Sequence, residues 1–185
     1  MARWLNSIGV AAFVLQYRLR PDYQSSVAYL DARRAIRYVR HNADAYGIDL
    51  DRIGMMGFSA EAVLASQMAT RYDAGDSRAS DPVEHVGSRP DFTVLVYPGL
   101  RDQDIERVTS DSPPSFLVAT HADRTVSPKK ALEFSEALLD NDIRAELRVF
   151  GRGAHGTGMA PGLPGLGQWP GLLAGWLRTQ GFLSD

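Results

Sequence analysis

The sequence predicts an α/β fold in which helices cover both faces of one mainly parallel sheet. First, short apolar runs recur along the chain and alternate with longer segments of helical periodicity. Second, most of these runs lack the polar alternation of a half-exposed strand, which favours strands buried on both faces. Together these observations indicate a three-layer, doubly wound arrangement with right-handed crossovers.

Five runs are the candidate strands of this sheet. They are rich in the apolar, β-branched and aromatic residues that strands favour, and they span Gly9–Tyr17, Arg52–Met56, Phe92–Tyr97, Ser115–Thr120 and Ala145–Phe150. We therefore expect about five strands.

Three further segments have helical patterns. Ser26–His41 places its apolar residues on one face, and Pro128–Leu139 follows Ser127, which is expected to be an N-cap with proline in the first turn. Gly171–Leu183 is amphipathic and closes the chain. These helices should cover the sheet.

Two segments fit neither pattern. Arg71–Pro90 is polar and is expected to form a mobile surface loop. Gly151–Gly171 contains eight glycines and three prolines and directly follows a candidate strand. Long irregular loops in that position often carry functional groups.

Composition excludes several classes of function. The 185 residues, 44% hydrophobic and 23% charged, suffice for one buried core, so a single domain is expected. A net charge of −2 predicts neither nucleic acid nor a membrane as partner, but a substrate that is neutral or small. The absence of cysteine excludes disulfides and a thiolate nucleophile. With no signal-peptide or membrane-span pattern, a cytoplasmic location is the default expectation, although a longer parent protein could be secreted.

The strongest local signal is the segment from Arg52 to Met68, where a strand runs through Gly57, Phe58 and Ser59 into an alanine-rich helix. A tight turn at the carboxyl end of a parallel strand lifts the serine hydroxyl out of the sheet. Ser59 is therefore a candidate nucleophile. The backbone N–H of Ala60, at the helix start, is then a candidate oxyanion donor. The alternative is that Ser59 only caps the helix.

Two more candidates also follow strands. Asp123 comes just after Ser115–Thr120, and His155 comes just after Ala145–Phe150. The carboxyl ends of parallel strands share one edge, so these side chains should meet Ser59 in the chain order Ser, Asp, His. His155 would accept the Ser59 proton and Asp123 would orient the imidazole. Taken singly, Asp123 could be a turn residue and His155 a surface histidine.

Other candidates are weaker. Asp102 and Asp104, after the strand Phe92–Tyr97, are the main alternative acids. The remaining histidines lie in a helical pattern, in the polar loop and beside Asp123; they are His41, His85 and His121. No metal-ligand spacing or phosphate-binding loop is recognisable, so no metal and no cofactor are expected.

With these motifs the chain resembles the α/β-hydrolase esterases, nearest the acetyl esterase and acetylxylan esterase-like branch. The resemblance also rests on Tyr17–Pro21, on Tyr46–Ile53 before the serine turn and on the closing segment Trp169–Phe182. It implies an α/β-hydrolase-type fold and a cofactor-free Ser-Asp-His mechanism. It also implies substrates that are short acyl esters, often on plant polysaccharides.

The chain departs from that family in two ways. The pattern G-x-S-x-G would place glycine where Glu61 stands. The glutamate must therefore bend away, find extra room, or strain the strand-to-helix turn at Ser59, which we call the elbow. In addition, the family's first three strands and its glycine-rich oxyanion loop have no counterpart here. The fold is therefore expected to be N-terminally incomplete, with a gap between Gly9–Tyr17 and Arg52–Met56. Either these strands pair directly or a second copy fills the gap, which predicts a homo-oligomer.

Three functions remain open at this point. The first is a serine esterase that hydrolyses acetyl-type esters of small molecules or carbohydrates. The second is a catalytically impaired or inactive hydrolase-like domain, because of Glu61 and the missing loop. The third is a serine peptidase or lactone hydrolase of the same fold.

Overall fold

A four-stranded parallel sheet forms the centre of the computed structural model, which describes residues 1–184. Its order is β1-β2-β3-β4, with bounds Gly54–Phe58, Phe92–Val96, Ser115–Thr120 and Ala145–Phe150. The register pairs Met56 with Val94 and Val94 with Phe116. The predicted parallel α/β architecture is confirmed, and β3 and β4 have the predicted bounds.

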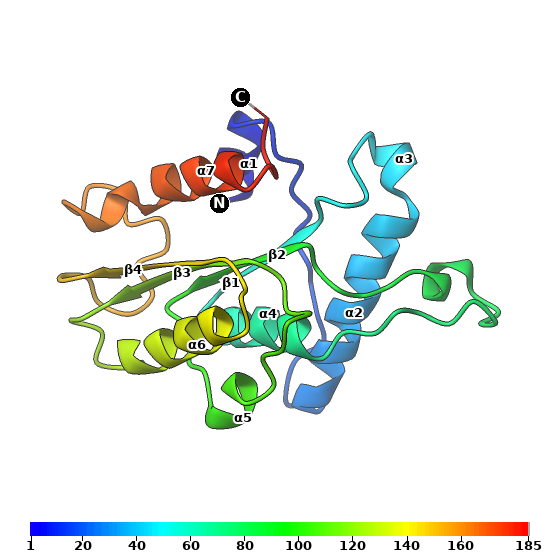
Figure 1. The fold of residues 1–185 in the computed structure, drawn as a ribbon, viewed down its shortest axis with the longest axis horizontal. Helices are drawn as coiled ribbons and strands as arrows, with labels where there is room; N and C mark the ends of the chain where they lie inside the picture. Colours follow the sequence, from blue (N-terminus) through cyan, green and yellow to red (C-terminus); the bar gives the residue numbers. More distant parts are fainter. Residues whose placement is uncertain (185) are drawn as a thin grey trace.

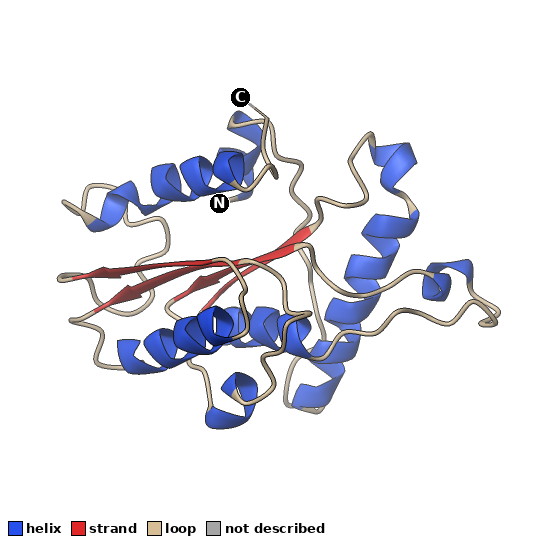
Figure 2. Ribbon diagram, viewed as in Figure 1, coloured by secondary structure: helices blue, strands red, loops and turns tan. Residues whose placement is uncertain are grey.

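Helices cover both faces of this sheet (Figures 1 and 2). On one face lie α1 (Ala2–Ser7) and α7 (Trp169–Thr179). The other face carries α4, α5 and α6, with bounds Ala60–Thr70, Asp102–Ile105 and Pro128–Asp140. At the side of α4 lies α2, followed by α3, with bounds Ser25–His41 and Ala43–Tyr46. Two short 3₁₀ helices, Pro82–His85 and Leu166–Gln168, lie in the long loops.

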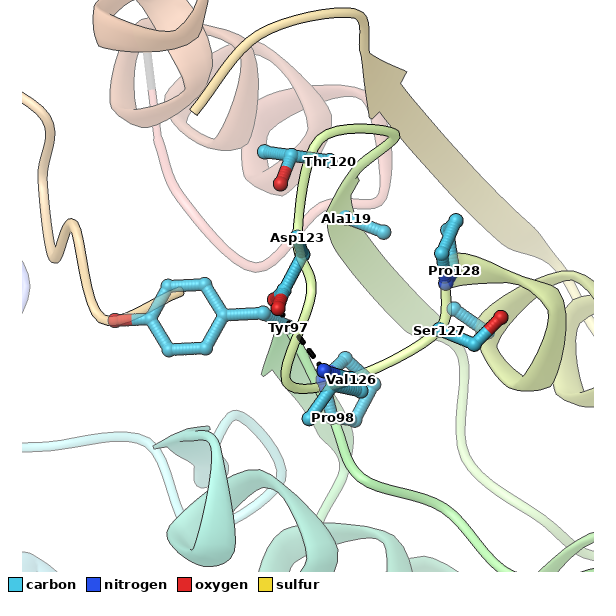
Figure 3. A pocket seen from close by; sticks show the side chains of 9 residues that line it. Tyr97, Pro98, Ala119, Thr120, Asp123, Val126, Ser127 and Pro128 are labelled. Carbon is cyan, nitrogen blue, oxygen red and sulfur yellow. Dashed lines mark hydrogen bonds between the residues drawn. The ribbon is translucent and has the colours of Figure 1, made fainter. Parts of the chain in front are cut away.

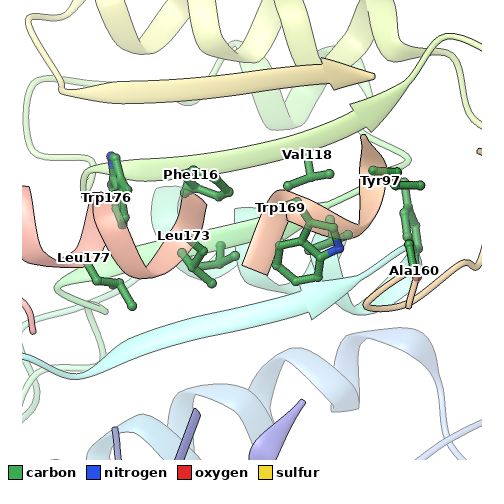
Figure 4. Packing of buried hydrophobic residues seen from close by; sticks show 11 residues of the cluster. Tyr97, Phe116, Val118, Ala160, Trp169, Leu173, Trp176 and Leu177 are labelled. Atoms are coloured by element: carbon green, nitrogen blue, oxygen red, sulfur yellow. The ribbon is translucent and has the colours of Figure 1, made fainter. Parts of the chain in front are cut away.

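The side chains of β2 and β3 alternate between two buried layers. One set packs under α7 and includes Val94, Val96, Phe116 and Val118 with Trp169 and Leu173 (Figure 4). The opposite set packs against α4 and α6 and includes Leu95 and Leu117 with Ala62, Ala65, Phe134 and Leu138. Because both faces are covered, the central residues Val94–Val96 and Phe116–Ala119 are apolar in succession, as the sequence pattern indicated. Each fully buried Val, Leu or Phe contributes roughly 1.5–3 kcal/mol.

The helix ends follow the local signals. Ser127 Oγ accepts a hydrogen bond from the Lys129 N–H at 3.3 Å, and Pro128 occupies the first turn, which confirms the predicted cap of α6. At the other end of the chain, α7 begins at Trp169, two residues before the predicted start. Pro170 is compatible with this start because the first helical turn needs no N–H partner.

The segment Gly9–Tyr17 is not a strand, which corrects the expected number of about five strands to four. It is separated from β1 by a cavity of about 1230 Å³ whose lining includes this segment, α2 and β1. A strand needs backbone partners on a neighbouring strand, and among the described residues no strand pairs with this segment. Within it, Val14 is 84% exposed and Phe13 is 52% exposed. The predicted gap is present, and the two flanking segments do not pair directly.

The polar segment Arg71–Pro90 is attached to α2 rather than free. Arg34 forms ion pairs with Asp81 at 2.6 Å and with Glu84 at 2.7 Å. Arg37, which is buried, contacts Glu84 and Asp73. Our expectation of a mobile loop overlooked these partners, because the arginines lie some 40 residues earlier in the chain.

No helix within residues 1–184 is both long enough and apolar enough to cross a membrane.

Candidate active site

Ser59 lies in a sharp turn between β1 and α4. Its backbone has φ +54° and ψ −112°, a conformation that L-residues rarely adopt and that costs on the order of 1–3 kcal/mol. The surrounding chain holds it there: the Ser59 N–H donates to Val96 O at 2.9 Å, and Ser59 O accepts from the Val63 N–H at 3.1 Å. Strain at a position held by neighbouring strands is typical of a functional residue.

Gly57 is the residue that allows strand and helix to cross so closely. A Cβ atom at position 57 would lie 2.1 Å from the carbonyl carbon and oxygen of Glu61 and 2.4 Å from Ala62 N. Two of the possibilities raised for Glu61 describe the structure: the glutamate bends away from the elbow, and it finds room there. The Glu61 side chain bends outward and is exposed, and its Oε1 accepts a hydrogen bond from Tyr17 Oη at 2.6 Å. The close crossing therefore requires glycine at position 57. The backbone of Glu61 itself does not have a positive φ.

Tyr17 is held to the elbow helix by this hydrogen bond. Burial, together with the hydrogen bond to Glu61 and the charge of that carboxylate, raises the pKa of Tyr17 to about 12. The phenol therefore remains protonated at neutral pH and continues to donate to Glu61. This contact links the segment Gly9–Tyr17 to the elbow across the cavity, whose lining includes both residues.

Three side chains from three strand ends meet at the carboxyl edge of the sheet. Ser59 Oγ lies 2.7 Å from Nε2 of His155, and Nδ1 of His155 lies 2.7 Å from Oδ2 of Asp123. The second carboxylate oxygen of Asp123 accepts the N–H groups of Thr125 at 2.8 Å and Val126 at 2.9 Å. Figure 3 shows the Asp123 carboxylate turned toward Val126. The structure thus brings together the three residues that the sequence singled out.

The charge of Asp123 is stabilised locally. Burial acts to raise the pKa of this carboxyl, but the hydrogen bonds from Val126, His155 and Thr125 outweigh it and hold the pKa below its usual value. An ionised Asp123 accepts a hydrogen bond from Nδ1–H of His155, which leaves Nε2 free to accept a hydrogen bond from the Ser59 hydroxyl. The arrangement therefore has the polarity that nucleophile activation needs.

Ala60 is the first residue of α4, directly after Ser59. Amide groups in the first turn of a helix have no intrahelical partner and favour negative charge. The Ala60 N–H is therefore available beside the Ser59 hydroxyl. The large cavity reaches this point as well, since Phe58 and Glu61 belong to its lining.

Tyr97 is a residue of the site that sequence reasoning missed. Its ring lies against the imidazole of His155, with centroids 4.9 Å apart, and its Oη accepts from the Gly158 N–H at 3.1 Å. Tyr97 directly follows β2 and has φ +40°. The sequence did contain a signal for Tyr97, namely its position at the carboxyl end of a predicted strand, the same sheet edge as the other candidates. Burial raises the pKa of Tyr97; the Gly158 hydrogen bond opposes this, and the Glu61 and Asp123 charges add to it.

The alternative acids are engaged elsewhere. Asp102 contacts Nζ of Lys130 at 2.5 Å, and Asp104 is fully buried in ion pairs with two arginines. Of the other histidines, His85 contacts Ala79 O at 2.8 Å. In the part of the chain that is described, no group of three or more histidine and acidic side chains is arranged to hold a metal ion.

Comparison with known proteins agrees with this fold. A family model described as alpha/beta hydrolase fold matches residues 1–161, and the chain belongs to this family. The predicted resemblance to α/β-hydrolase esterases is thereby confirmed.

Three relatives make the family relationship more specific. Endo-1,4-beta-xylanase B of Butyrivibrio fibrisolvens is 30% identical over 82% of this chain, and an acetylxylan esterase of Xylanibacter ruminicola is 26% identical over 95% of it. The crystal structure of an acetyl ester-xyloside bifunctional hydrolase from Caldicellulosiruptor lactoaceticus has a TM-score of 0.95 and 38% identity, covering 99% of this chain and 76% of that one. The chain spans only 28% and 40% of the two curated relatives. Within the α/β-hydrolase family, the chain is thus similar to an acetylxylan esterase and to an acetyl ester-xyloside bifunctional hydrolase.

Proposed function

We propose that this chain is a serine esterase that hydrolyses short-chain, acetyl-type carboxylic esters through an acyl-enzyme. Ser59 is the nucleophile, His155 the general base and acid, and Asp123 the group that orients the imidazole. The observation that carries this proposal is the hydrogen-bonded series Ser59 Oγ, His155 and Asp123, with both donor–acceptor distances at 2.7 Å.

The reaction follows from this geometry. Nε2 of His155 takes the proton of Ser59 as Oγ bonds to the ester carbonyl carbon, and the negative charge that develops on the carbonyl oxygen faces the Ala60 N–H. When the tetrahedral intermediate collapses, His155 returns that proton to the leaving alcohol, and the acyl group stays on Ser59. A water molecule then repeats the sequence, which releases the carboxylic acid and restores Ser59.

The substrate class comes from the relatives and from charge. The names of two of them contain acetylxylan and acetyl ester-xyloside, which supports acetylated carbohydrates as substrates of this chain too. The exposed carboxylate of Glu61 beside the elbow disfavours esters with an anionic acyl or alcohol part. A neutral acetylated sugar fits both considerations.

The cavity favours a second candidate, a hydrolase-like domain with low turnover. Ala60 supplies one oxyanion donor, and the space next to it opens into the cavity of about 1230 Å³. Loss of one oxyanion donor lowers turnover by roughly 10²- to 10³-fold. This candidate predicts hydrolysis that depends on Ser59 but is slow.

Hydrolysis of 4-nitrophenyl acetate by the protein and by Ser59→Ala tests both candidates. We expect the variant to fall to the background rate, while Ser7→Ala, an exposed serine in α1, keeps the full rate. Equal rates for the protein and Ser59→Ala would contradict the catalytic proposal. Acetate release from acetylated xylan, compared with butyrate and octanoate esters, then tests the substrate class.

A further inference from the structure

The loop that carries His155 is fixed at two points. Near its start, the carbonyl oxygen of Gly153 accepts a hydrogen bond from Thr120 Oγ1 at 2.7 Å. Beyond His155, Gly158 is held on both sides: its N–H donates to Tyr97 Oη at 3.1 Å, and its carbonyl oxygen accepts from Trp169 Nε1 at 3.1 Å. The catalytic candidate lies between these anchors.

The loop needs such anchors because of its composition. Gly153, Gly156 and Gly158 all have positive φ, and no neighbouring atom would obstruct a Cβ at position 156 or 158. Glycine has more accessible backbone conformations than any other residue, so this stretch has little intrinsic preference for one shape. The His155 side chain remains 20% exposed, so burial alone does not fix its ring.

The two side chains that hold Gly158 are themselves rigid. Trp169 is completely buried at the start of α7, and Tyr97 is 6% exposed at the end of β2. The ring of Phe58 contacts both, with centroids 5.9 Å from Tyr97 and 6.1 Å from Trp169. Figure 4 shows Tyr97 and Trp169 on the same side of the sheet. We call Phe58, Tyr97 and Trp169 the aromatic clamp.

The aromatic clamp contacts both Ser59's elbow and His155, the proposed nucleophile and base. Phe58 is the residue directly before Ser59, so it belongs to the elbow. Tyr97 contacts the imidazole of His155 edge to face, with an interplanar angle of 61°. A displacement of about 1 Å between reacting groups can cost roughly 10²-fold in rate. One rigid group that contacts the elbow and the histidine loop is well placed to prevent such a displacement.

We propose that Tyr97 and Trp169 are positioning residues that hold the histidine loop through Gly158, so that Nε2 of His155 stays within hydrogen-bond reach of Ser59 Oγ. This inference rests on the proposed esterase function. Neither residue is given a part in bond making: the Tyr97 hydroxyl accepts from a backbone N–H, and Trp169 donates to a backbone carbonyl.

Tyr97→Phe is the first test, because it keeps the ring against His155 and removes only the hydroxyl that accepts from Gly158. We expect kcat for 4-nitrophenyl acetate to fall about tenfold, equivalent to roughly 1.4 kcal/mol, with little change in KM, since the lost hydrogen bond acts on the position of the reacting groups. Tyr72→Phe is the matched control. It also loses a phenol bonded to a backbone atom, Asp111 O at 2.7 Å, but at the opposite end of α4.

A double variant tests whether the two hydrogen bonds act as one device. Trp169→Phe removes the donor to Gly158 O, and it also serves if Tyr97→Phe does not fold. Both bonds hold the same residue, so we expect Tyr97→Phe with Trp169→Phe to lose about as much kcat as the more damaging single variant. Losses that multiply would overturn the idea of one clamp. Circular dichroism of each variant verifies that it is folded.

Nuclear magnetic resonance of the ¹⁵N-histidine-labelled protein gives a readout that does not depend on activity. The Nδ1–H of His155, hydrogen-bonded to Asp123, should give a low-field signal that exchanges slowly with water. We expect faster exchange in Tyr97→Phe and no change in Tyr72→Phe. If the protein hydrolyses no ester yet the signal responds in this way, the proposed function fails and the clamp stands. If Tyr97→Phe keeps both full kcat and an unchanged signal, the clamp is wrong.

Discussion

The two sides of Ser59 differ in how they are built. On the side of β2 and β3 the sheet is covered on both faces: Leu95 and Leu117 are completely buried, and the Asp123 carboxylate accepts three hydrogen bonds. On the other side, β1 faces a cavity of about 1230 Å³, beyond which Val14 is 84% exposed. There, the hydrogen bond from Tyr17 to Glu61 spans from the outlying segment to the elbow helix.

This difference separates two parts of one proposed reaction. The groups that activate the nucleophile depend on β1 to β4 and are fully assembled. Stabilisation of the oxyanion depends on Ala60 and on the open side. Variants on the assembled side should therefore affect rate strongly, whereas variants in the outlying segment Gly9–Tyr17 should affect association and stability more than rate.

The largest expected effect is on the assembled side. Asp123→Asn should lower kcat/KM by roughly 10³- to 10⁴-fold, because an amide does not hold the imidazole in the correct tautomer, as known for serine proteases. Asp102→Asn, which alters an exposed carboxylate in α5, should have no such effect. Initial rates with 4-nitrophenyl acetate measure both, and similar rates for the two variants would exclude Asp123 from the mechanism.

On the open side we expect association with a second copy. Within residues 1–184 the outer edge of β1 has no strand partner, and unpaired edges beside apolar surface promote pairing between chains. Light scattering over a range of concentrations should show twice the monomer mass, and Val14→Lys should shift the protein toward monomer. Val149→Lys makes the same change on β4, the opposite edge of the sheet, and should not. A strict monomer at high concentration would remove this prediction.

Substitutions of Gly57 and of Glu61 in the elbow should have different effects. Gly57→Ala forces a Cβ into the backbone of α4 and should destabilise the protein by about 1–3 kcal/mol or more. Glu61→Gly should give no gain in kcat, since Glu61 has no positive φ that glycine would relieve, and should cost up to about 1 kcal/mol through helix propensity. Urea denaturation and ester hydrolysis measure these effects. A marked rise in kcat for Glu61→Gly would show that the glutamate does distort the elbow.

The smallest expected effect concerns pH. The pKa of Tyr17 is raised to about 12 in the folded protein, above its ordinary value of about 10. A raised pKa means that the contribution of Tyr17 to stability is complete below pH ~10 and is lost as pH rises from about 10 to about 12. The difference in unfolding free energy between the protein and Tyr17→Phe should therefore shrink over that range. A constant difference would indicate that the contact with Glu61 does not persist in solution.

Much of the site followed from local patterns. Ser115–Thr120 and Ala145–Phe150 are strands with the predicted bounds, and each is followed by a residue that reaches Ser59 directly or through His155. This worked because parallel strands share one carboxyl edge, so strand order alone brings their following residues together. The catalytic roles of these residues, the oxyanion role of Ala60 and the single-domain organisation remain predictions.

Other features could not be predicted in this way. An apolar run such as Gly9–Tyr17 has strand propensity, but a strand exists only if a neighbour supplies backbone partners. In the polar segment Arg71–Pro90, acidic residues pair with the arginines of α2. For Gly9–Tyr17 the strand partner is absent from the neighbourhood, and for Arg71–Pro90 the ion-pair partners lie far away in the chain.

The amino-acid sequence by itself determined the order of strands and helices, the elbow at Ser59 and the placement of Asp123 and His155, because these depend on periodicity and on sheet topology. Only the tertiary structure decided that Gly57, and not position 61, is the site of close crossing, that Glu61 turns outward to Tyr17, and that Tyr97 and Trp169 hold the histidine loop. Each of those depends on contacts between residues 4 to 61 positions apart, with partners that no local pattern specifies.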